Sequence, residues 1–543
     1  MGLRRRIGVA LAASALFLSA CGGGGGGGTQ QPGSGAFSER PAREGVSNTA
    51  PGGGEALAKG SPAKGGTLTY GLYAPAETLD PVAPSGNGAT PIMMAVYGLL
   101  FHADKDGNVV PDMAEGLETP DSGKTWIIKL DPAIKFSDGA ALDSAAVKKH
   151  YERIAAEGSR SPSAASMRAI ETIEATDPTT VTLVLKQPSM AFPKVFLGVS
   201  GMPVASFIPS PNVPVDQMSR NPVGAGPFKV QNYSPGGDAN LVRNETYYEE
   251  GKPYLDSIKF VTATDTQARL AAVKSGSIDI ATTQSGVDIL DAEGAGVTAL
   301  IQPNATYFDM LFNNSKAPFD DKDFRRAVIQ AIDLNALNDA IFNGTHTVMT
   351  GIVPPDNSNY VDTGWPSYDL EAAKKGVEAF KAKGGDPTFT LTSTSPPEFM
   401  KMSQLMQQML AEAGITMNIE VGDQPTMVTQ AFSGNYTSQL RFTSVSAETD
   451  GYIRNDYRTG LPSNLVRAGD PKVDQILDDL TKVETPEERK AKLAELQEAL
   501  TEWMPLMPMI AHHNAYLVGS KVNQFPGGVT TTFFHWEDVA AAS

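Results

Sequence analysis

Residues 114–154 read AEGLETPDSGKTWIIKLDPAIKFSDGAALDSAAVKKHYERI, and this stretch carries the clearest local signals in the chain. Apolar side chains stand at alternate positions of 125–130, which predicts a β-strand that buries one face. Asp143 is a favourable helix N-cap, and the apolar residues of 147–154 then recur at helical spacing. The stretch therefore predicts at least one strand followed by a helix.

The same two patterns recur on either side of this stretch. Alternating apolar residues predict strands at 66–73 and 180–185, and helical stripes run through 324–331 and 493–503. Strands and helices are mixed without strict alternation, and the sequence has no repeat of fixed length. About 480 residues follow the N-terminal region, which is too many for one simple core, so we expect an α/β protein of two or three domains.

The N-terminus has the organisation of an export signal. Three consecutive arginines precede an uncharged apolar run of about 14 residues, shorter than the roughly 20 that span a bilayer. The run ends Leu18-Ser19-Ala20-Cys21, which resembles the bacterial lipobox, and Cys21 is the only cysteine of the chain. We therefore expect a signal peptide over 1–21 and lipidation of Cys21. The alternative is a free thiol in an ordinary signal peptide.

A glycine- and proline-rich segment, 22–64, follows this cysteine. Its composition cannot bury enough apolar surface to fold. As a flexible coil of about 43 residues it has a mean reach of roughly 35–40 Å. We expect it to act as a disordered tether that holds a folded body close above a membrane.

Composition and motifs exclude several classes of function. The formal charge of −17 argues against nucleic-acid binding. The sequence contains no G-x-S-x-G elbow, no complete Walker A motif and no complete dinucleotide fingerprint. A pair of catalytic carboxylates is not recognisable among 61 acidic residues. Because no catalytic constellation stands out, we expect a protein that is not an enzyme.

The histidines give no metal-binding pattern. None stands in an H-E-x-x-H or H-x-x-x-H arrangement. If His512 and His513 lie in one strand, they point to opposite faces and cannot easily share an ion. We expect structural histidines, no metal site and no cofactor. The six are His102, His150, His346, His512, His513 and His535.

The stretch 114–154 resembles the signature of the family 5 extracellular solute-binding proteins, importer receptors for dipeptides, oligopeptides and nickel. The resemblance rests on the strand, the Lys-Phe-Ser-Asp-Gly segment at 135–139 and the start of the helix, although Leu117 replaces the family's usual tryptophan. Other segments resemble family motifs in the same order, and the resemblance covers 65–538. They are 78–81 (TLDP), 97–100 (YGLL), 221–228 (NPVGAGPF), 252–256 (KPYLD), 324–333 and 505–508 (PLMP).

This resemblance implies an α/β, periplasmic-binding-protein type II-like fold with two lobes, a hinge and three domains. Domain I would be discontinuous and comprise 65–100, 203–285 and 506–543. Domain II would comprise 101–202, and domain III 286–505. A ligand would be enclosed between domains I and III by hinge closure. Such enclosure requires a hydrogen-bond partner for each buried polar group of the ligand.

Two regions of the first two domains match places that contact the ligand in relatives. The first follows the Leu-Asp-Pro turn, where peptide-binding relatives pair with the ligand backbone as with an added strand. The alternative for this region is a plain surface loop. Its residues are Ser85, Gly86, Asn87 and Gly88. The second region contains Ser161 and Ser163, which stand where domain II reaches the pocket in relatives.

The remaining candidate site is 441–454, RFTSVSAETDGYIR. Peptide-binding relatives have here an aspartate that holds the α-ammonium group of the ligand and, before it, a tryptophan. Ala447 and Ser444 occupy those positions in this chain. Either the ligand lacks a free amine, or Glu448 or Asp450 supplies the counter-charge that a buried ammonium needs. The alternative for both acids is a solvated loop.

Two aromatic residues of the same region are also candidates. Phe442 and Tyr452 would line the pocket or, alternatively, pack in the core.

The function implied by the resemblance is capture of peptides or peptide-like solutes outside the cytoplasm and their delivery to an ABC permease and its ATPase. The partners would be the ligand, the importer complex and the membrane through the lipid anchor, without nucleic acid, and the protein would act as a monomer. Three alternatives stay open. They are a receptor for a non-peptide solute (a sugar, a metal chelate or a modified amino acid), a ligand sensor, and an exported hydrolase.

Overall fold

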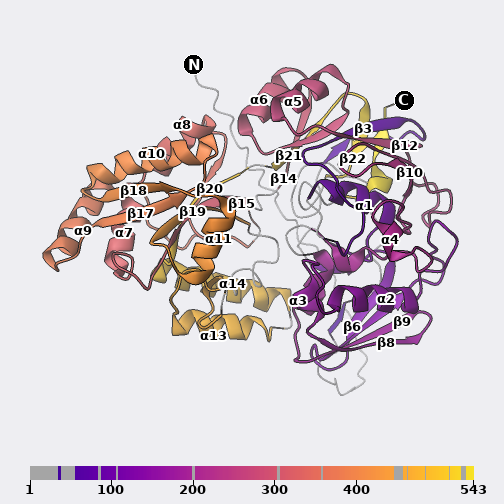
Figure 1. The fold of residues 1–543 in the computed structure, drawn as a ribbon, viewed down its shortest axis with the longest axis horizontal. Helices are drawn as coiled ribbons and strands as arrows, with labels where there is room; N and C mark the ends of the chain where they lie inside the picture. The colour runs from indigo at the N-terminus through magenta and orange to yellow at the C-terminus, as the bar shows by residue number, and fades with distance from the viewer. Residues whose placement is uncertain are drawn as a thin grey trace, which may run out of the picture.

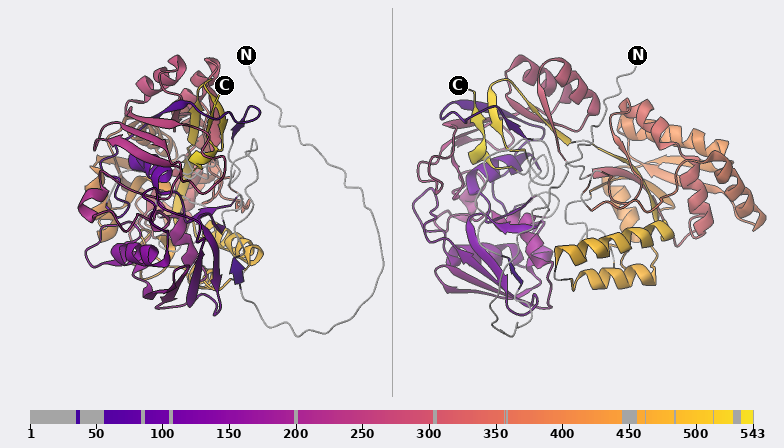
Figure 2. Two further views of the ribbon diagram at one scale, coloured as in Figure 1. Left: turned by 90° about the vertical axis from the view of Figure 1, so that its right-hand side faces the viewer. Right: turned by 180° about the vertical axis from the view of Figure 1, so that it is seen from behind.

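The computed structural model describes residues 35–37, 56–83, 87–104, 108–198, 202–302, 306–355, 357, 359–444, 456–461, 463–483, 485–512, 514–527 and 534–542. These residues form two lobes that are built on separate sheets and lie side by side in Figure 1. The view from behind shows the same division (Figure 2). The first lobe contains segments from both ends of the chain, and the second is built from 306–511.

The first lobe is organised around β3 (Thr67–Leu72), the strand predicted at 66–73. Leu68, Tyr70 and Leu72 are buried, as their alternation indicates. β3 pairs in parallel with β12 and β13 inside a mixed seven-stranded sheet of order β10–β11–β12–β3–β13–β21–β14. The other strands are Phe228–Tyr233 (β10), Ala239–Arg243 (β11), Ser257–Thr262 (β12), Ile280–Thr283 (β13), Asn514–Val518 (β21) and Thr298–Gln302 (β14).

Both faces of this sheet are covered. On β21, Ala515 and Leu517 pack into a small core with residues of α5 (Thr266–Ser275) and α6 (Gly286–Gly294). Tyr516 and Val518, which alternate with them, belong to the larger core of the lobe. The alternation of side chains along one strand therefore separates the two cores.

The stretch 114–154 contains the predicted strand and helix, and a further strand, β6, precedes them. β7 (Thr125–Leu130) pairs with β6 (Ala114–Thr119), and Asp143 caps α2 (Ser144–Ala155) by accepting a hydrogen bond from the amide of Ala146 at 2.9 Å. These strands belong to a five-stranded antiparallel sheet of order β1–β6–β7–β9–β8. Its apolar residues join those of the seven-stranded sheet in one core. The other strands are Gly35–Phe37 (β1), Ile170–Asp177 (β8) and Thr180–Leu185 (β9).

The second lobe is a six-stranded sheet with helices packed around it and its own hydrophobic core. The sheet order is β16–β20–β15–β19–β17–β18, with bounds Thr347–Val348, Leu506–Ala511, Thr306–Phe312, Ser438–Ser444, Thr388–Ser393 and Thr416–Val421. The two helical stripes predicted from the sequence are confirmed in α7 and α14. The helices are Lys322–Ala331 (α7), Leu334–Phe342 (α8), Leu370–Ala382 (α9), Pro397–Glu412 (α10), Gln424–Ser433 (α11), Pro471–Leu480 (α13) and Pro486–Trp503 (α14).

Shorter elements complete the first lobe. Two small sheets contain β4 (Phe101–Ala103) with β5 (Val109–Pro111), and β22 (Val522–Phe525) between β2 (Leu57–Ala58) and β23 (Ala540–Ala541). The helices are Thr90–Tyr97 (α1), Ala164–Met167 (α3) and Val215–Met218 (α4), with 3-10 turns at Asn87–Ala89 (η2), Phe192–Leu197 (η3), Val204–Ser206 (η4) and Trp536–Asp538 (η5). Within the described ranges, no helix has the length and apolarity that crossing a bilayer requires.

Two neighbouring strand pairs connect the lobes. β14 lies in the sheet of the first lobe and β15, the next strand, in that of the second; β20 and β21 make the return crossing. Residues 286–302, which the sequence boundary places in domain III, thus contribute α6 and β14 to the first lobe, and β20 from the last segment of domain I joins the second lobe. Periodicity in the sequence identifies a strand but not the sheet that the strand joins. The predicted domain boundaries at 286 and 506 therefore differ from the observed division into lobes.

A buried charge network fixes β19 to β15. Asp309 of β15 is fully buried and accepts hydrogen bonds from Arg441 at 2.8 Å (Nε to Oδ1) and 3.0 Å (Nη2 to Oδ2), and from the hydroxyl of Thr443. Arg441 Nη2 also reaches Asp456 Oδ2 at 3.4 Å. Arg441 therefore links two carboxylates, Asp309 on β15 and Asp456 beyond 445–455. Loss of a single partner from such a network costs about 3–5 kcal/mol.

This network generates a prediction about pH. Burial raises the pKa of Asp456 to about 6; Asp309 adds to the rise and Arg441 opposes it. The folded state then holds a proton that the unfolded state has released between about pH 4 and pH 6, so stability falls as the pH rises through this window. Relative to Asp456→Asn, we expect the wild type to lose about 2–3 kcal/mol from pH 4 to pH 7 in urea unfolding of the second lobe.

The control for this prediction is Asp478→Asn, which removes an acid on α13 that pairs with Arg458 instead. Above pH 5, the free energy of unfolding of this variant should change with pH in parallel with that of the wild type. If the curves of wild type and Asp456→Asn also run parallel, or if the wild type gains stability with rising pH, the carboxyl titrates normally and the prediction is wrong.

Candidate ligand-binding site

The second lobe exposes an aromatic ring beside one of the two chain crossings. Phe442, near the end of β19, is 41% exposed, although it contacts other aromatic rings. His512 lies between β20 and β21, in the return crossing. The two rings meet edge to face with centroids 4.8 Å apart. Phe442 is thus held at the junction between the lobes.

Behind Phe442 lies an aromatic cluster that holds the ring in place. Phe308 of β15 contacts Phe442 at 5.2 Å between centroids and His512 at 4.8 Å, and Phe342 of α8 lies 5.5 Å from His512. His346 stacks on Phe342 at 4.4 Å and 15°. Since these supporting rings are buried or nearly so, the free face of Phe442 is positioned before any ligand arrives. We call Phe308, Phe342, Phe399, Phe442, His346 and His512 the aromatic cluster.

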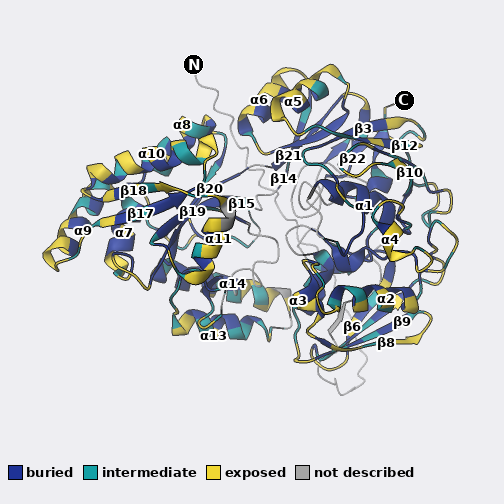
Figure 3. Ribbon diagram, viewed as in Figure 1, coloured by how far each residue is buried: buried dark blue, intermediate teal, exposed yellow. Residues whose placement is uncertain are grey.

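Helix α11 lies on the side of the second lobe nearer the first, and part of it is exposed (Figure 3). Val428 and Phe432 are one helical turn apart and are 44% and 52% exposed. The helix is fixed to β19 by Gln439, whose buried amide donates to the carbonyl of Met427 at 3.1 Å. Exposed apolar groups on a fixed helix commonly mark a contact surface.

In the first lobe, the turn that precedes the predicted site at 85–88 is firmly held. Asp80 accepts hydrogen bonds from the amide of Val82 at 3.0 Å and from the guanidinium of Arg153 on α2 at 2.8 Å. The hydroxyl of Tyr97 donates to the carbonyl of Leu79 at 2.9 Å. The Leu-Asp-Pro motif therefore has a structural role, because Asp80 joins this turn to α2 through Arg153.

Gly88 follows this turn at a point where two segments nearly touch. A Cβ at residue 88 would lie 2.1 Å from the carbonyl oxygen of Ala74, so only glycine fits without movement. Asn87 begins η2, which leads into α1. The backbone at 87–89 is thus pressed against the end of β3.

The two serines predicted from domain II are buried. Ser161 Oγ accepts a hydrogen bond from the amide of Ser163 at 3.3 Å, which stabilises the turn before α3. Ser163 is fully buried, and its hydroxyl has no hydrogen-bond partner among the described residues. A ligand would reach either residue only after local movement, and their role in binding stays a prediction.

Several predicted site residues lie outside the described residues: Ser85, Gly86, Ala447, Glu448, Asp450, Tyr452 and the lipidation site Cys21. Ser444 is the last residue of β19, where it pairs with Thr306 of β15. The structure therefore brings Phe442 and Ser444 to the edge of 445–455 and does not test the two acids.

The sequence did not identify the partners of Phe442. His512 was considered only beside His513 in one strand, whereas β20 ends at Ala511 and β21 begins at Asn514. Phe308 and Phe342 are separated from Phe442 by at least 100 residues, and nothing in their spacing signals a contact. The polar run His512-His513-Asn514 between two apolar runs is the one local signal of a crossing.

Comparison with known proteins places the chain in a family. The family model of bacterial extracellular solute-binding proteins, family 5 (middle region), matches residues 108–459, well over half of the chain. A glutathione-binding protein, GsiB of Salmonella paratyphi A, is 27% identical over 470 residues, which cover 81% of this chain and 89% of GsiB.

Solved structures of similar fold agree. The oligopeptide-binding protein AppA from Bacillus subtilis, in complex with a nonapeptide, superposes with a TM-score of 0.69 at 19% identity over 89% of this chain and 100% of AppA. AgaA from A. tumefaciens R10, in complex with agropinic acid, gives 0.68 at 26% identity over 88% and 98%. The α/β, periplasmic-binding-protein type II-like fold is confirmed. The chain belongs to the family 5 bacterial extracellular solute-binding proteins, which bind solutes for ABC importers and are not enzymes.

Proposed function

We propose that this protein captures a peptide or peptide-like solute between its two lobes and delivers it to an ABC permease. The observation that carries the proposal is the exposed ring of Phe442, held by the aromatic cluster at the chain crossing. A ring fixed in this way offers apolar area at little cost in conformational entropy. GsiB is a glutathione-binding protein and AppA was solved with a nonapeptide, which favours ligands with peptide bonds.

Closure of the lobes follows from how they are connected. Two short crossings, one after β14 and one after β20, permit rotation of one lobe against the other. Closure would remove Phe442 and the exposed side chains of α11 from water, and would offer the ends of strands to the polar groups of the ligand. The shape change would then report occupancy to the permease.

We propose the three-domain division predicted from the sequence with two adjustments. Domain III would begin near 303 rather than 286, because β14 joins the sheet of the first lobe and α6 packs on it. It would end at 511 rather than 505, because β20 pairs with β15 in the second lobe. Domain II would be the five-stranded sheet with α2, and domain I the seven-stranded sheet.

A second candidate is a receptor for a non-peptide solute. AgaA has 26% identity, and its structure contains agropinic acid. In this chain Ala447 replaces the aspartate that the resemblance leads one to expect, so the ligand need not have a free amine. Comparing a free peptide pool with the same pool after N-acetylation separates these cases. Equal affinity means that neither Glu448 nor Asp450 holds an ammonium group.

The role of Phe442 can be tested by calorimetry. We expect the purified protein to bind glutathione or a component of a tri- to pentapeptide pool, and Phe442→Ala to weaken that binding at least tenfold. The reason is the loss of about 1.5–3 kcal/mol of apolar burial in the closed state.

The matched control is Tyr368→Ala, which truncates a comparably exposed aromatic residue before α9 and should leave the affinity unchanged. Unchanged affinity in Phe442→Ala would remove this ring from the site. A wild type that binds no peptide but does bind sugar-derived or amino-acid-derived solutes would favour the second candidate.

We also propose that Cys21 carries the lipid that anchors the protein to the outer face of the membrane. The support is its place at the end of the uncharged run and its status as the only cysteine. In host fractionation, Cys21→Ala should move most of the protein from the membrane to the soluble fraction, whereas Gly25→Ala should not. Membrane retention of Cys21→Ala at the wild-type level would show that another feature attaches the chain.

A further inference from the structure

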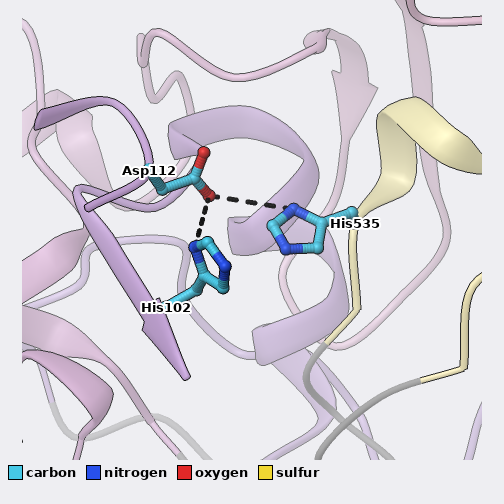
Figure 4. Close-up of side chains that lie close together, drawn as sticks. All are labelled: His102, Asp112 and His535. Carbon is cyan, nitrogen blue, oxygen red and sulfur yellow. Dashed lines mark ion pairs between the residues drawn. The ribbon is translucent and has the colours of Figure 1, made fainter. Parts of the chain in front are cut away.

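Three side chains that are far apart in sequence converge in the first lobe, outside the candidate ligand-binding site (Figure 4). His102 belongs to β4, Asp112 follows β5 directly, and His535 stands just before η5 near the C-terminus. One ligand atom from each lies within 4.8 Å of the other two. Asp112 Oδ2 is 3.8 Å from His102 Nδ1 and 3.7 Å from His535 Nδ1.

A fourth group stands next to these three. Glu537 is buried, and its Oε1 lies 3.0 Å from His535 Nδ1. Two imidazoles and two carboxylates are thus gathered by β4, the residue after β5 and the C-terminal segment. Imidazole nitrogen and carboxylate oxygen are the ligands with which Zn²⁺ forms four-coordinate sites.

The separations suit a tetrahedral ion. Bonds of about 2.0–2.2 Å place neighbouring ligand atoms about 3.3–3.5 Å apart. Three of the six separations among the four ligand atoms, 3.0, 3.7 and 3.8 Å, lie on either side of this value. Small rotations of the two imidazole rings, which are perpendicular with centroids 5.1 Å apart, would therefore complete the site.

The surroundings also suit a bound ion. The hydroxyl of Tyr248 donates to Asp112 Oδ1 at 3.2 Å, which leaves Oδ2 directed toward the histidines and orients the carboxylate, as outer partners of metal ligands do. Asp112, His535 and Glu537 line a small pocket together with Tyr247 and Tyr248.

We propose that His102, Asp112, His535 and Glu537 form a Zn²⁺ site that joins the C-terminal segment to the β4–β5 sheet. The ion would cross-link residues separated by more than 400 positions in the chain and so stabilise the first lobe. The Asp112 carboxylate is central, because its Oδ2 lies within 3.8 Å of both histidines.

The test is zinc titration of the chelator-treated protein by calorimetry, with metal content measured by mass spectrometry. We expect one equivalent of Zn²⁺ and a raised melting temperature. His102→Gln and His535→Gln should each weaken binding at least about 100-fold, since each removes a ligand rather than an outer partner. Glu249→Gln, which removes a neighbouring acid paired with Lys252, should bind Zn²⁺ as the wild type does.

If the wild type takes up no zinc, or if the two histidine variants take up as much zinc as the wild type, the proposal is wrong. Should the variants not fold, Co²⁺ substitution of the wild type decides. The intense visible absorption of a tetrahedral ion supports the site, and a weak octahedral spectrum contradicts it. Phe442 lies in the other lobe. Peptide binding by the metal-free protein would therefore show that the zinc site and the proposed function are independent.

Discussion

The two crossings between the lobes are the constraint on which the rest of the structure depends. β14 and β15 are consecutive strands in different sheets, and so are β20 and β21, so the chain leaves the first lobe and returns to it at one place. Each lobe has its own core, and within the described residues the largest buried clusters do not mix. A connection of this kind resists separation and still allows rotation. His512 lies in the return crossing and contacts Phe442, so the exposed ring lies beside this crossing.

The second lobe is built to keep this ring in place. Asp309 lies on β15, beside the strand that bears Phe442, and accepts hydrogen bonds from Arg441 and Thr443, while Arg441 also contacts Asp456. Burying these charges costs stability, and the close pairing with Arg441 offsets that cost. These contacts hold β19 against β15 and so fix the strand that carries Phe442. A binding surface that is ordered before the ligand arrives loses less entropy on binding.

Local signals in the sequence predicted local structure well. The alternation in 125–130, the cap at Asp143 and the stripe in 324–331 each correspond to an observed element, because each depends on neighbours within one turn or one strand. Sheet membership could not be predicted in this way, and β14 is the example. Of the candidate site, Phe442 was identified through family resemblance, but its partners His512 and Phe308 were not. The cluster of His102, Asp112 and His535 has no spacing signal at all, since folding alone brings its members together.

Small-angle X-ray scattering of the mature protein, with and without a ligand whose binding calorimetry has established, tests the central claim most directly. If the lobes rotate about the two crossings to enclose the ligand, saturation should reduce the radius of gyration and the maximum dimension, and Phe442→Ala at equal saturation should show the same closed shape. Identical scattering curves for the free and the saturated wild-type protein would contradict the account.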